Sequence, residues 1–346
     1  MSVAKDVATS EFYAVQKEVA ELNLEFGDLN FLKRKFYWFP YRRKESLEHM
    51  KSFWTVSNFD FLSDAYFGWG VNPRTLSLMR RSLKEKKPFF FVEDGFIRSL
   101  YHGGCAPKFR LGRSFTVDTK APYYCGDLET DLENKILSTT NDSYDVAEVS
   151  GIIRKIVDSQ LSKYNHQPRA SDLPKTDNET VLVIGQNYGD KSLQFGGVGD
   201  DVFDLMLEDA LSTGATVYYK VHPDVIDTNG ESRTDPRIHF LREGCNPISL
   251  LKQFDRVYVA TSQMGFEALL MGKPVKVYGK PFYAGWGLTE DVLEFPRRKK
   301  KKKVEDIFYA TYISYTHYLD LENKNYITLS CLLDILLKQR KECFGY

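Results

Sequence analysis

The sequence predicts an α/β protein built from two domains, each organised around a largely parallel sheet. The chain has 346 residues, which is long enough for two hydrophobic cores. Its 42% hydrophobic and 27% charged residues are typical of globular proteins. Short apolar runs alternate with helical segments, as in parallel sheets. Residues 165–177 contain two prolines and many polar side chains, as expected of a linker. We therefore expect domains over residues 1–165 and 176–296, followed by helices over 304–346.

The first domain is predicted to contain strands over 65–70 and 89–92, joined by a basic helix over 73–86. Residues 1–50 combine helical periodicity with a basic and aromatic segment over 33–43. The second strand runs directly into Glu93, Asp94 and Gly95. A carboxylate in this position can serve as a general acid or base. A solvated Asp–Gly turn is the alternative interpretation.

The second domain repeats the pattern, with strands predicted over 181–184, 215–221, 257–260 and 275–278. Helices are predicted over 201–211 and 265–271, and after residue 303 over 304–318 and 329–341. Polar residues follow the strand ends, namely Glu93 in the first domain and Asp190, His222 and Ser262 in the second. In open parallel sheets, ligands bind at the carboxyl ends of the strands. We therefore expect these groups to line a cleft between the domains.

Each of these residues could carry chemistry at such a cleft. Asp190 would be the second carboxylate of a pair, as in glycoside chemistry, although it could simply cap a turn. His222 could donate to a phosphate, and Lys220 would add positive charge. Ser262 begins a predicted helix, whose amino end attracts anions. Glu267 lies just inside that helix, where its carboxylate could hold ribose hydroxyls.

Composition excludes several classes of function. Lys+Arg and Asp+Glu both number 47, and a net charge of zero argues against a nucleic-acid-binding protein. The five cysteines are widely spaced, which favours neither a disulfide framework nor a zinc site. This use of cysteine fits a reducing cytoplasm, so we expect a cytoplasmic protein. The polar amino-terminal stretch has no apolar core, so we expect no signal peptide. We expect no cofactor and no metal, because no motif for a metal–diphosphate pair is present.

Residues 297–303 form a run of seven cations. A solvated loop is one interpretation of this run. The functional interpretation is peripheral contact with the anionic inner membrane. Binding to nucleic acid is the third interpretation, and it fits a net charge of zero least well.

Six segments resemble, in the same order, motifs of the KpsC/LipA-type capsule polysaccharide β-Kdo glycosyltransferases. They are residues 93–99, 186–192, 220–225, 261–269, 272–275 and 281–289, and the last two of them are long and specific. The resemblance covers roughly residues 65–340. Members of KpsC type usually carry two such modules and this chain carries one, so we expect it to make a single linkage.

The resemblance implies a GT-B-like fold, with two Rossmann-like domains, an interdomain cleft and a carboxyl-terminal helix that returns to the amino-terminal domain. It also implies an activity: transfer of Kdo from CMP-β-Kdo to a glycan or glycolipid acceptor, with retention. The product would be a β-Kdo linkage in capsule or lipopolysaccharide biosynthesis. Two alternatives stay open: another CMP-sugar transferase, such as a sialyltransferase-like enzyme, or a non-catalytic scaffold for polysaccharide export.

The resemblance also assigns roles to residues. Asp190 matches the nucleophile, and Glu93 matches the acid/base on the acceptor side. The residues expected to bind CMP are His222, Ser262, Gln263, Gly265, Glu267 and the neighbouring Lys220. Gln186, Asp94 and Arg98 lie within the matching motifs, where we expect contact with substrate.

Overall fold

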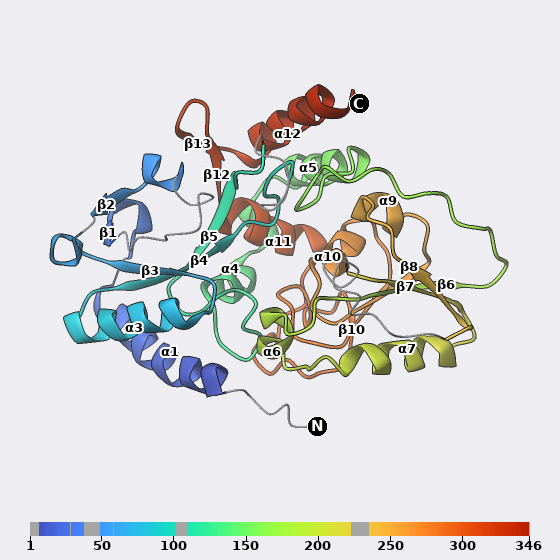
Figure 1. Cartoon of the computed structure of the whole chain (residues 1–346), viewed down its shortest axis with the longest axis horizontal. Helices are drawn as coiled ribbons and strands as arrows, with labels where there is room; N and C mark the ends of the chain where they lie inside the picture. Colours follow the sequence, from blue (N-terminus) through green and yellow to red (C-terminus); the bar gives the residue numbers. More distant parts are fainter. Residues whose placement is uncertain are drawn as a thin grey trace. The chain divides into compact units, whose positions relative to one another are not determined.

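The computed structural model describes residues 7–27, 29–37, 49–57, 59–101, 109–222 and 235–345 (Figure 1). Within these ranges the chain divides into two compact units. Unit 1 comprises residues 124–127 and 136–309, and unit 2 comprises residues up to 123, 128–135 and those from 310 onward. This division differs from the expected boundary at residue 165. The physical reason is that helix α5 (Val146–Asp158) packs against α11 (Val304–Phe308), and both helices lie in unit 1.

Unit 1 contains a parallel sheet of six strands. They are β6 (Thr180–Ile184), β7 (Thr216–Lys220), β8 (Ile238–Leu241), β9 (Arg256–Val259), β10 (Val275–Val277) and β11 (Glu290–Asp291). Their spatial order is β8-β7-β6-β9-β10-β11, and every neighbouring pair is parallel. This is the doubly wound order in which the chain starts at the centre of the sheet and returns there to build the other half. The strands predicted for the second domain are thus confirmed, and β8 and β11 are additional.

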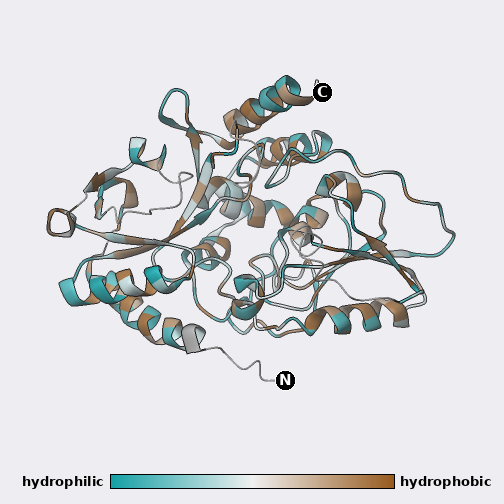
Figure 2. Ribbon diagram, in the orientation of Figure 1, coloured by the Kyte–Doolittle hydropathy of each residue, from teal (hydrophilic) through white to brown (hydrophobic). Residues whose placement is uncertain are grey.

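Helices cover both faces of this sheet, as Figure 1 shows for α7 on one side and for α9 and α10 on the other. Helix α7 (Val202–Ser212) packs on β6 and β7, while α9 (Pro247–Leu251) and α10 (Gln263–Leu270) pack together. The alternation of side chains along β6 shows why helices cover both faces of the sheet. Val181 and Val183 belong to the core beneath α7, whereas Leu182, also buried, points to the opposite face. The central strands are hydrophobic along their length because both of their faces are covered (Figure 2).

Unit 2 contains a mixed sheet with the order β13-β12-β5-β4-β3. Its strands are β3 (Tyr66–Trp69), β4 (Phe89–Asp94), β5 (Ser114–Asp118), β12 (Thr316–Asp320) and β13 (Asn325–Ile327). Strands β3 and β4 are parallel and joined by helix α3 (Pro73–Glu85), as predicted. The other three pairs are antiparallel. The Rossmann-like pattern expected for the first domain is therefore limited to β3–α3–β4.

The segment after residue 303 differs from its prediction as one helix over 304–318. Helix α11 ends at Phe308 and continues as a π-helix (η5, Tyr309–Tyr315), after which the chain enters β12. Tertiary pairing accounts for the difference, because His317 and Tyr318 lie opposite Phe115 and Ser114 of β5. The predicted final helix is confirmed as α12 (Leu329–Phe344).

An aromatic core holds four short elements of unit 2 against its sheet. These elements are η1 (Phe31–Lys33), β1 (Lys35–Tyr37), η2 (His49–Ser52) and β2 (Thr55–Ser57). Unit 2 also contains α1 (Val7–Glu25), η3 (Asp60–Leu62) and the first part of α4 (Asp131–Ser138). The rings of Phe31, Phe36 and Trp54 pack with Phe90 of β4 and Phe115 of β5. Burial of such large rings is the main source of stability for these short segments.

Candidate functional site

The centre of the unit 1 sheet brings together two of the predicted polar segments. Strands β6 and β9 are neighbours although the chain visits β7 and β8 between them, so their carboxyl ends form the topological switch point. Gln186 follows β6 and Thr261 follows β9. The Thr261 N–H donates to Gln186 Oε1 at 2.9 Å, and Gln186 Nε2 donates to Thr261 Oγ1 at 3.0 Å. Two polar loops are thereby joined at the position where such folds bind ligands.

Asp190 lies in the same cluster. Its Oδ1 accepts the Ser192 N–H at 2.8 Å and caps α6 (Lys191–Phe195), and Gln186 Nε2 lies 3.4 Å from its Oδ2. Ser192 Oγ is 2.9 Å from Thr261 Oγ1. Gly189, with a φ of +69°, supplies the left-handed turn that presents Asp190. Gln186, Asp190, Ser192 and Thr261 form what we call the switch-point cluster.

Sequence reasoning singled out Gln186 and Asp190 but not Ser192 or Thr261 as site residues. The signal for Thr261 was present, because it stands at the end of a predicted strand immediately before Ser262. The signal for Ser192 was also present, because this residue ends the matching segment over 186–192. In the structure, Asp190 caps α6 by accepting the Ser192 N–H, which places Ser192 in the cluster.

The amino end of α10 lies beside this cluster. Ser262 is the N-cap residue, and its side chain accepts the Met264 N–H at 3.3 Å. Gly265 is required for close packing: a Cβ there would lie 2.3 Å from Tyr283 Oη. That hydroxyl donates to the Ser262 carbonyl at 2.5 Å. Residues Thr261 to Met264 are partly exposed, so the first turn of α10 is accessible to an anion.

Glu267 lies on the next turn of α10 and is 3% exposed. Its Oε1 accepts hydrogen bonds from Ser162 Oγ at 2.6 Å and from Gln263 Nε2 at 3.3 Å. Its Oε2 is buried and has no hydrogen-bond partner among the described residues. Burial raises the pKa of Glu267 to about 7, against the opposing effect of the two hydrogen bonds. One carboxyl oxygen of Glu267 is therefore buried without a hydrogen bond among the described residues, which is uncommon for a polar atom.

We expect the Glu267→Gln substitution to remove a pH dependence of stability. The folded state raises the pKa of Glu267, so this group contributes stability below pH 4.5 that is lost as the pH rises through about 7. Wild type should lose about 2 kcal/mol of unfolding free energy between pH 5 and pH 8 from this residue. Urea unfolding of both proteins at the two pH values checks this. Parallel pH dependence of wild type and variant would contradict it.

Strand β7 ends in Lys220, which is buried and whose Nζ donates to the Val221 carbonyl at 3.0 Å. Burial lowers the pKa of Lys220, and the nearby Cys245 thiol has the opposite effect. His222 follows and is partly exposed at the carboxyl edge of the sheet. The rest of this predicted motif, residues 223–225, lies outside the described residues.

Glu93, Asp94 and Arg98 belong to unit 2. Glu93 is partly exposed at the carboxyl end of β4, paired in the sheet with Thr116. Asp94 Oδ1 lies 2.9 Å from Arg98 Nε, and the Arg98 side chain is 8% exposed. The Arg98 guanidinium also donates to the carbonyl of Arg110 at 3.0 Å. In this structure, Arg98 thus binds protein groups and holds Asp94 in place.

The specific motif over 281–289 forms a compact loop. Trp286 is buried and donates from Nε1 to the Phe282 carbonyl at 2.8 Å. The Arg298 guanidinium lies over the Trp286 ring and donates to the carbonyls of Pro281 and Ala284. This loop also supplies the Tyr283 that packs on α10. The motif therefore supports the amino end of α10 by packing.

The run of seven cations is divided between two roles. Three of its members bind main-chain carbonyls of unit 1. Arg297 donates to the carbonyls of Gly126 and Asp127, and Arg298 donates to those of Pro281 and Ala284. Lys302 donates to the carbonyls of Leu137 and Thr139. The exposed cations are Lys299, Lys300, Lys301 and Lys303. The interpretation of the whole run as a solvated loop is therefore wrong for three of its members.

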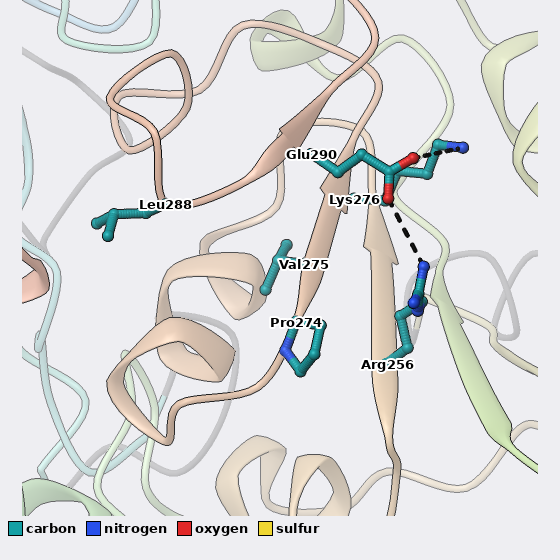
Figure 3. Close-up of a pocket in the computed structure, with 6 residues that line it drawn as sticks. All are labelled: Arg256, Pro274, Val275, Lys276, Leu288 and Glu290. Atoms are coloured by element: carbon teal, nitrogen blue, oxygen red, sulfur yellow. Dashed lines mark ion pairs between the residues drawn. The ribbon is translucent and has the colours of Figure 1, made fainter. Parts of the chain in front are cut away.

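A hollow of about 150 Å³ lies at the opposite, amino edge of the unit 1 sheet (Figure 3). It is lined by Arg256, Pro274, Val275, Lys276, Leu288 and Glu290. Glu290 lies 3.0 Å from Lys276 Nζ and 3.6 Å from Arg256 Nη1, as the dashed lines in Figure 3 indicate. Since these charges already pair with one another, we assign no ligand to this hollow.

The described residues contain no group of three or more His, Cys, Asp or Glu side chains placed to hold a metal ion. In the same part of the chain, no helix is both long and apolar enough to cross a membrane.

Comparison with known proteins places the chain in a family. The model of the family "Capsule polysaccharide biosynthesis protein" matches residues 124–318. The chain is 36% identical over 294 residues to the capsule polysaccharide modification protein LipA of Neisseria meningitidis serogroup A, covering 79% of this chain and 41% of LipA. It is 33% identical over 271 residues to the lipopolysaccharide-processing protein LpsZ of Rhizobium meliloti, covering 75% of this chain and 60% of LpsZ. The chain thus spans about two fifths of the length of LipA.

Two solved structures support the fold. The β-Kdo 2,4 transferase of Thermosulfurimonas dismutans KpsC has a TM-score of 0.78 and 30% identity, covering 89% of this chain and 99% of that chain. The β-Kdo 2,7 transferase of the same KpsC has a TM-score of 0.67 and 24% identity, with the same coverage, and supports the fold alone. The first match confirms the predicted GT-B-like α/β class.

Proposed function

The chain belongs to the family of capsule polysaccharide biosynthesis proteins, and from this premise we propose that it is a retaining β-Kdo glycosyltransferase. The reaction transfers Kdo from CMP-β-Kdo to a glycan or glycolipid acceptor in capsule or lipopolysaccharide biosynthesis. The observation that carries the proposal is the switch-point cluster, which holds the Asp190 carboxylate beside the accessible amino end of α10.

The proposed mechanism has two steps. In the first, an Asp190 oxygen forms a bond to the anomeric carbon of Kdo while the bond to CMP breaks and CMP leaves with the electron pair. In the second, Glu93 accepts the proton of an acceptor hydroxyl, whose oxygen displaces Asp190 from the anomeric carbon. Two displacements return the original configuration, so the product is β-linked. The positions of Gln186 and Ser192 support this role, because their hydrogen bonds fix the Asp190 carboxylate.

The CMP moiety would bind around α10. Its phosphate would meet the first turn of that helix at Ser262 and Gln263, where the backbone dipole favours an anion. His222 and Lys220 at the end of β7 would add donors to the same anion. Glu267 would accept a ribose hydroxyl through Oε2, the buried oxygen without a hydrogen-bond partner among the described residues. No metal is required for a donor with a single phosphate.

On the substrate side, we assign Gln186, Asp94 and Arg98. Gln186 would contact the sugar directly, since it is already hydrogen-bonded to Asp190 and Thr261. Arg98 would act through Asp94, because its own side chain is buried. Gly265 would contribute through packing, by allowing Tyr283 to approach the amino end of α10.

The experiment is a transfer assay with donors compared side by side. CMP-Kdo is generated in situ because it is labile, and a panel of Kdo-terminated and lipid-linked acceptors is analysed by mass spectrometry. We expect one Kdo added per acceptor with CMP-Kdo and none with CMP-sialic acid. Transfer only from CMP-sialic acid would favour the sialyltransferase-like alternative. No transfer from either donor, with CMP still bound, would favour the export scaffold.

We further propose a cytoplasmic location with peripheral contact at the anionic inner membrane through residues 297–303. The four exposed lysines of this run support the proposal, because each basic residue near such a surface contributes about 1 kcal/mol. Zero net charge speaks against nucleic acid as the partner.

Replacing Lys299, Lys300 and Lys301 by glutamine should therefore weaken binding to anionic vesicles about tenfold or more, without loss of fold. These side chains are exposed, whereas Arg297, Arg298 and Lys302 hold main-chain carbonyls and are left in place. Vesicle sedimentation and thermal unfolding check the two parts. Equal binding of wild type and variant would leave these lysines as solvated side chains.

A further inference from the structure

A surface of unit 2 combines exposed hydrophobic side chains with basic ones that form no ion pair among the described residues, and the proposed transfer reaction does not use it. Its members are Leu32, Lys33, Arg34, Phe59, Phe61 and Leu62, which we call the aromatic–basic patch. It includes the start of the basic and aromatic segment seen in the sequence.

The hydrophobic members are unusually exposed for their size. Phe59 is 60%, Phe61 73%, Leu62 49% and Leu32 47% exposed. Three of them occur within four consecutive residues, and the rings of Phe59 and Phe61 contact each other with centroids 5.7 Å apart. Figure 2 shows hydrophobic colour on this turn, which precedes β3. Single exposed hydrophobic residues are common, but a contiguous group marks an interaction surface.

Hydrogen bonds hold the two segments of the patch together. The Ser57 hydroxyl donates to the Phe59 carbonyl at 2.9 Å, which fixes the start of the turn. At its other end, Asp64 Oδ1 accepts the Lys35 N–H at 2.7 Å, and the Asp64 N–H donates to the Lys35 carbonyl at 2.9 Å. Lys35 begins β1 and directly follows Leu32–Arg34 in the chain. The turn and the basic segment are therefore neighbours in a fixed arrangement.

The basic members have no acidic partner within the described ranges. Lys33 is exposed and Arg34 partly so, and neither forms an ion pair there. By contrast, other cations of the same unit are paired, such as Arg113 with Glu322 at 2.5 Å. Cations beside exposed aromatic side chains complement a surface that has an apolar interior and anionic headgroups.

We infer that the aromatic–basic patch docks on an anionic phospholipid bilayer, with Phe59, Phe61 and the two leucines entering the headgroup boundary. Lys33 and Arg34 meet lipid phosphates at the same depth. Both contributions are needed, because apolar insertion and electrostatic attraction add in binding at membrane interfaces. This surface belongs to unit 2, whereas the exposed lysines over 299–303 belong to unit 1. The inference does not depend on which sugar is transferred.

The test uses sedimentation of the whole protein with vesicles of phosphatidylglycerol and phosphatidylethanolamine, and with vesicles of phosphatidylcholine alone. We expect each of two double variants to lower the partition coefficient on anionic vesicles about tenfold or more. One variant is Phe59→Ser/Phe61→Ser, and the other is Lys33→Gln/Arg34→Gln. The matched control is Val146→Ser/Leu205→Ser, which removes two comparably exposed hydrophobic side chains of unit 1 and should bind as wild type does. Wild-type binding by the Phe59/Phe61 variant would overturn the inference.

A second measurement keeps the test independent of folding. In a Phe61→Trp variant, brominated acyl chains in anionic vesicles should quench the new tryptophan, because the residue enters the bilayer. Absence of added quenching relative to wild type would overturn the inference. A second result would also overturn the inference: a dimeric wild-type protein whose Phe59→Ser/Phe61→Ser variant is monomeric but binds vesicles as wild type does. In that case a second copy of the chain would cover the patch.

Discussion

Asp190→Asn should lower Kdo transfer at least about 1,000-fold while CMP binding stays within about twofold of wild type. The amide has nearly the same shape as the carboxylate, and its oxygen can still accept the Ser192 N–H that caps α6. It cannot form the proposed bond to the anomeric carbon. The loss should therefore appear in the rate of transfer, measured by product mass, and not in CMP affinity, measured by calorimetry.

The matched control for this variant is Asp201→Asn. Asp201 precedes α7, is exposed, and makes no side-chain cap hydrogen bond, so the same change of charge occurs in the same unit without the proposed role. We expect it to retain wild-type transfer. Wild-type transfer by Asp190→Asn would remove Asp190 as the nucleophile, and equal losses in both variants would assign the effect to charge alone.

Glu93→Gln should lower transfer by about 10²–10⁴-fold, the usual contribution of a general acid or base. The glutamine cannot accept the proton of the acceptor hydroxyl in the second step. CMP is a good leaving group and needs no protonation, so the first step should proceed. We therefore expect donor cleavage, followed as CMP release in a single turnover, to survive in this variant while transfer to the acceptor is lost.

A control in the same unit is Glu18→Gln, an exposed glutamate of α1. It should transfer Kdo at the wild-type rate. Equal loss of the single-turnover CMP burst and of transfer in Glu93→Gln would contradict the acid/base role and would point to donor binding or to the fold.

The elements of unit 1 were predictable because their signals are local. Strands β6 and β9 are runs of β-branched and aromatic residues, buried on both faces, with polar residues directly after each. Ser262 and Gly272 bracket α10 with the expected cap chemistry. These patterns were sufficient to place Asp190 and Ser262 at strand ends.

Other features depend on contacts between distant parts of the chain. The antiparallel half of the unit 2 sheet was missed, because β5 pairs with β12 about 200 residues later. The role of Gly265 depends on Tyr283, and that of Arg298 on the carbonyls of Pro281 and Ala284. Composition alone could not separate such a buried cation from its exposed lysine neighbours.

The most direct measurement of the proposed mechanism is the mass of the Glu93→Gln protein after incubation with CMP-Kdo and no acceptor. The mechanism predicts a covalent adduct of one Kdo on the peptide that contains Asp190, and none when Asp190→Asn is added. The wild-type product with acceptor should be β-linked by NMR. Turnover without any adduct, together with an α-linked product, would contradict the account, because a single displacement inverts the anomeric centre.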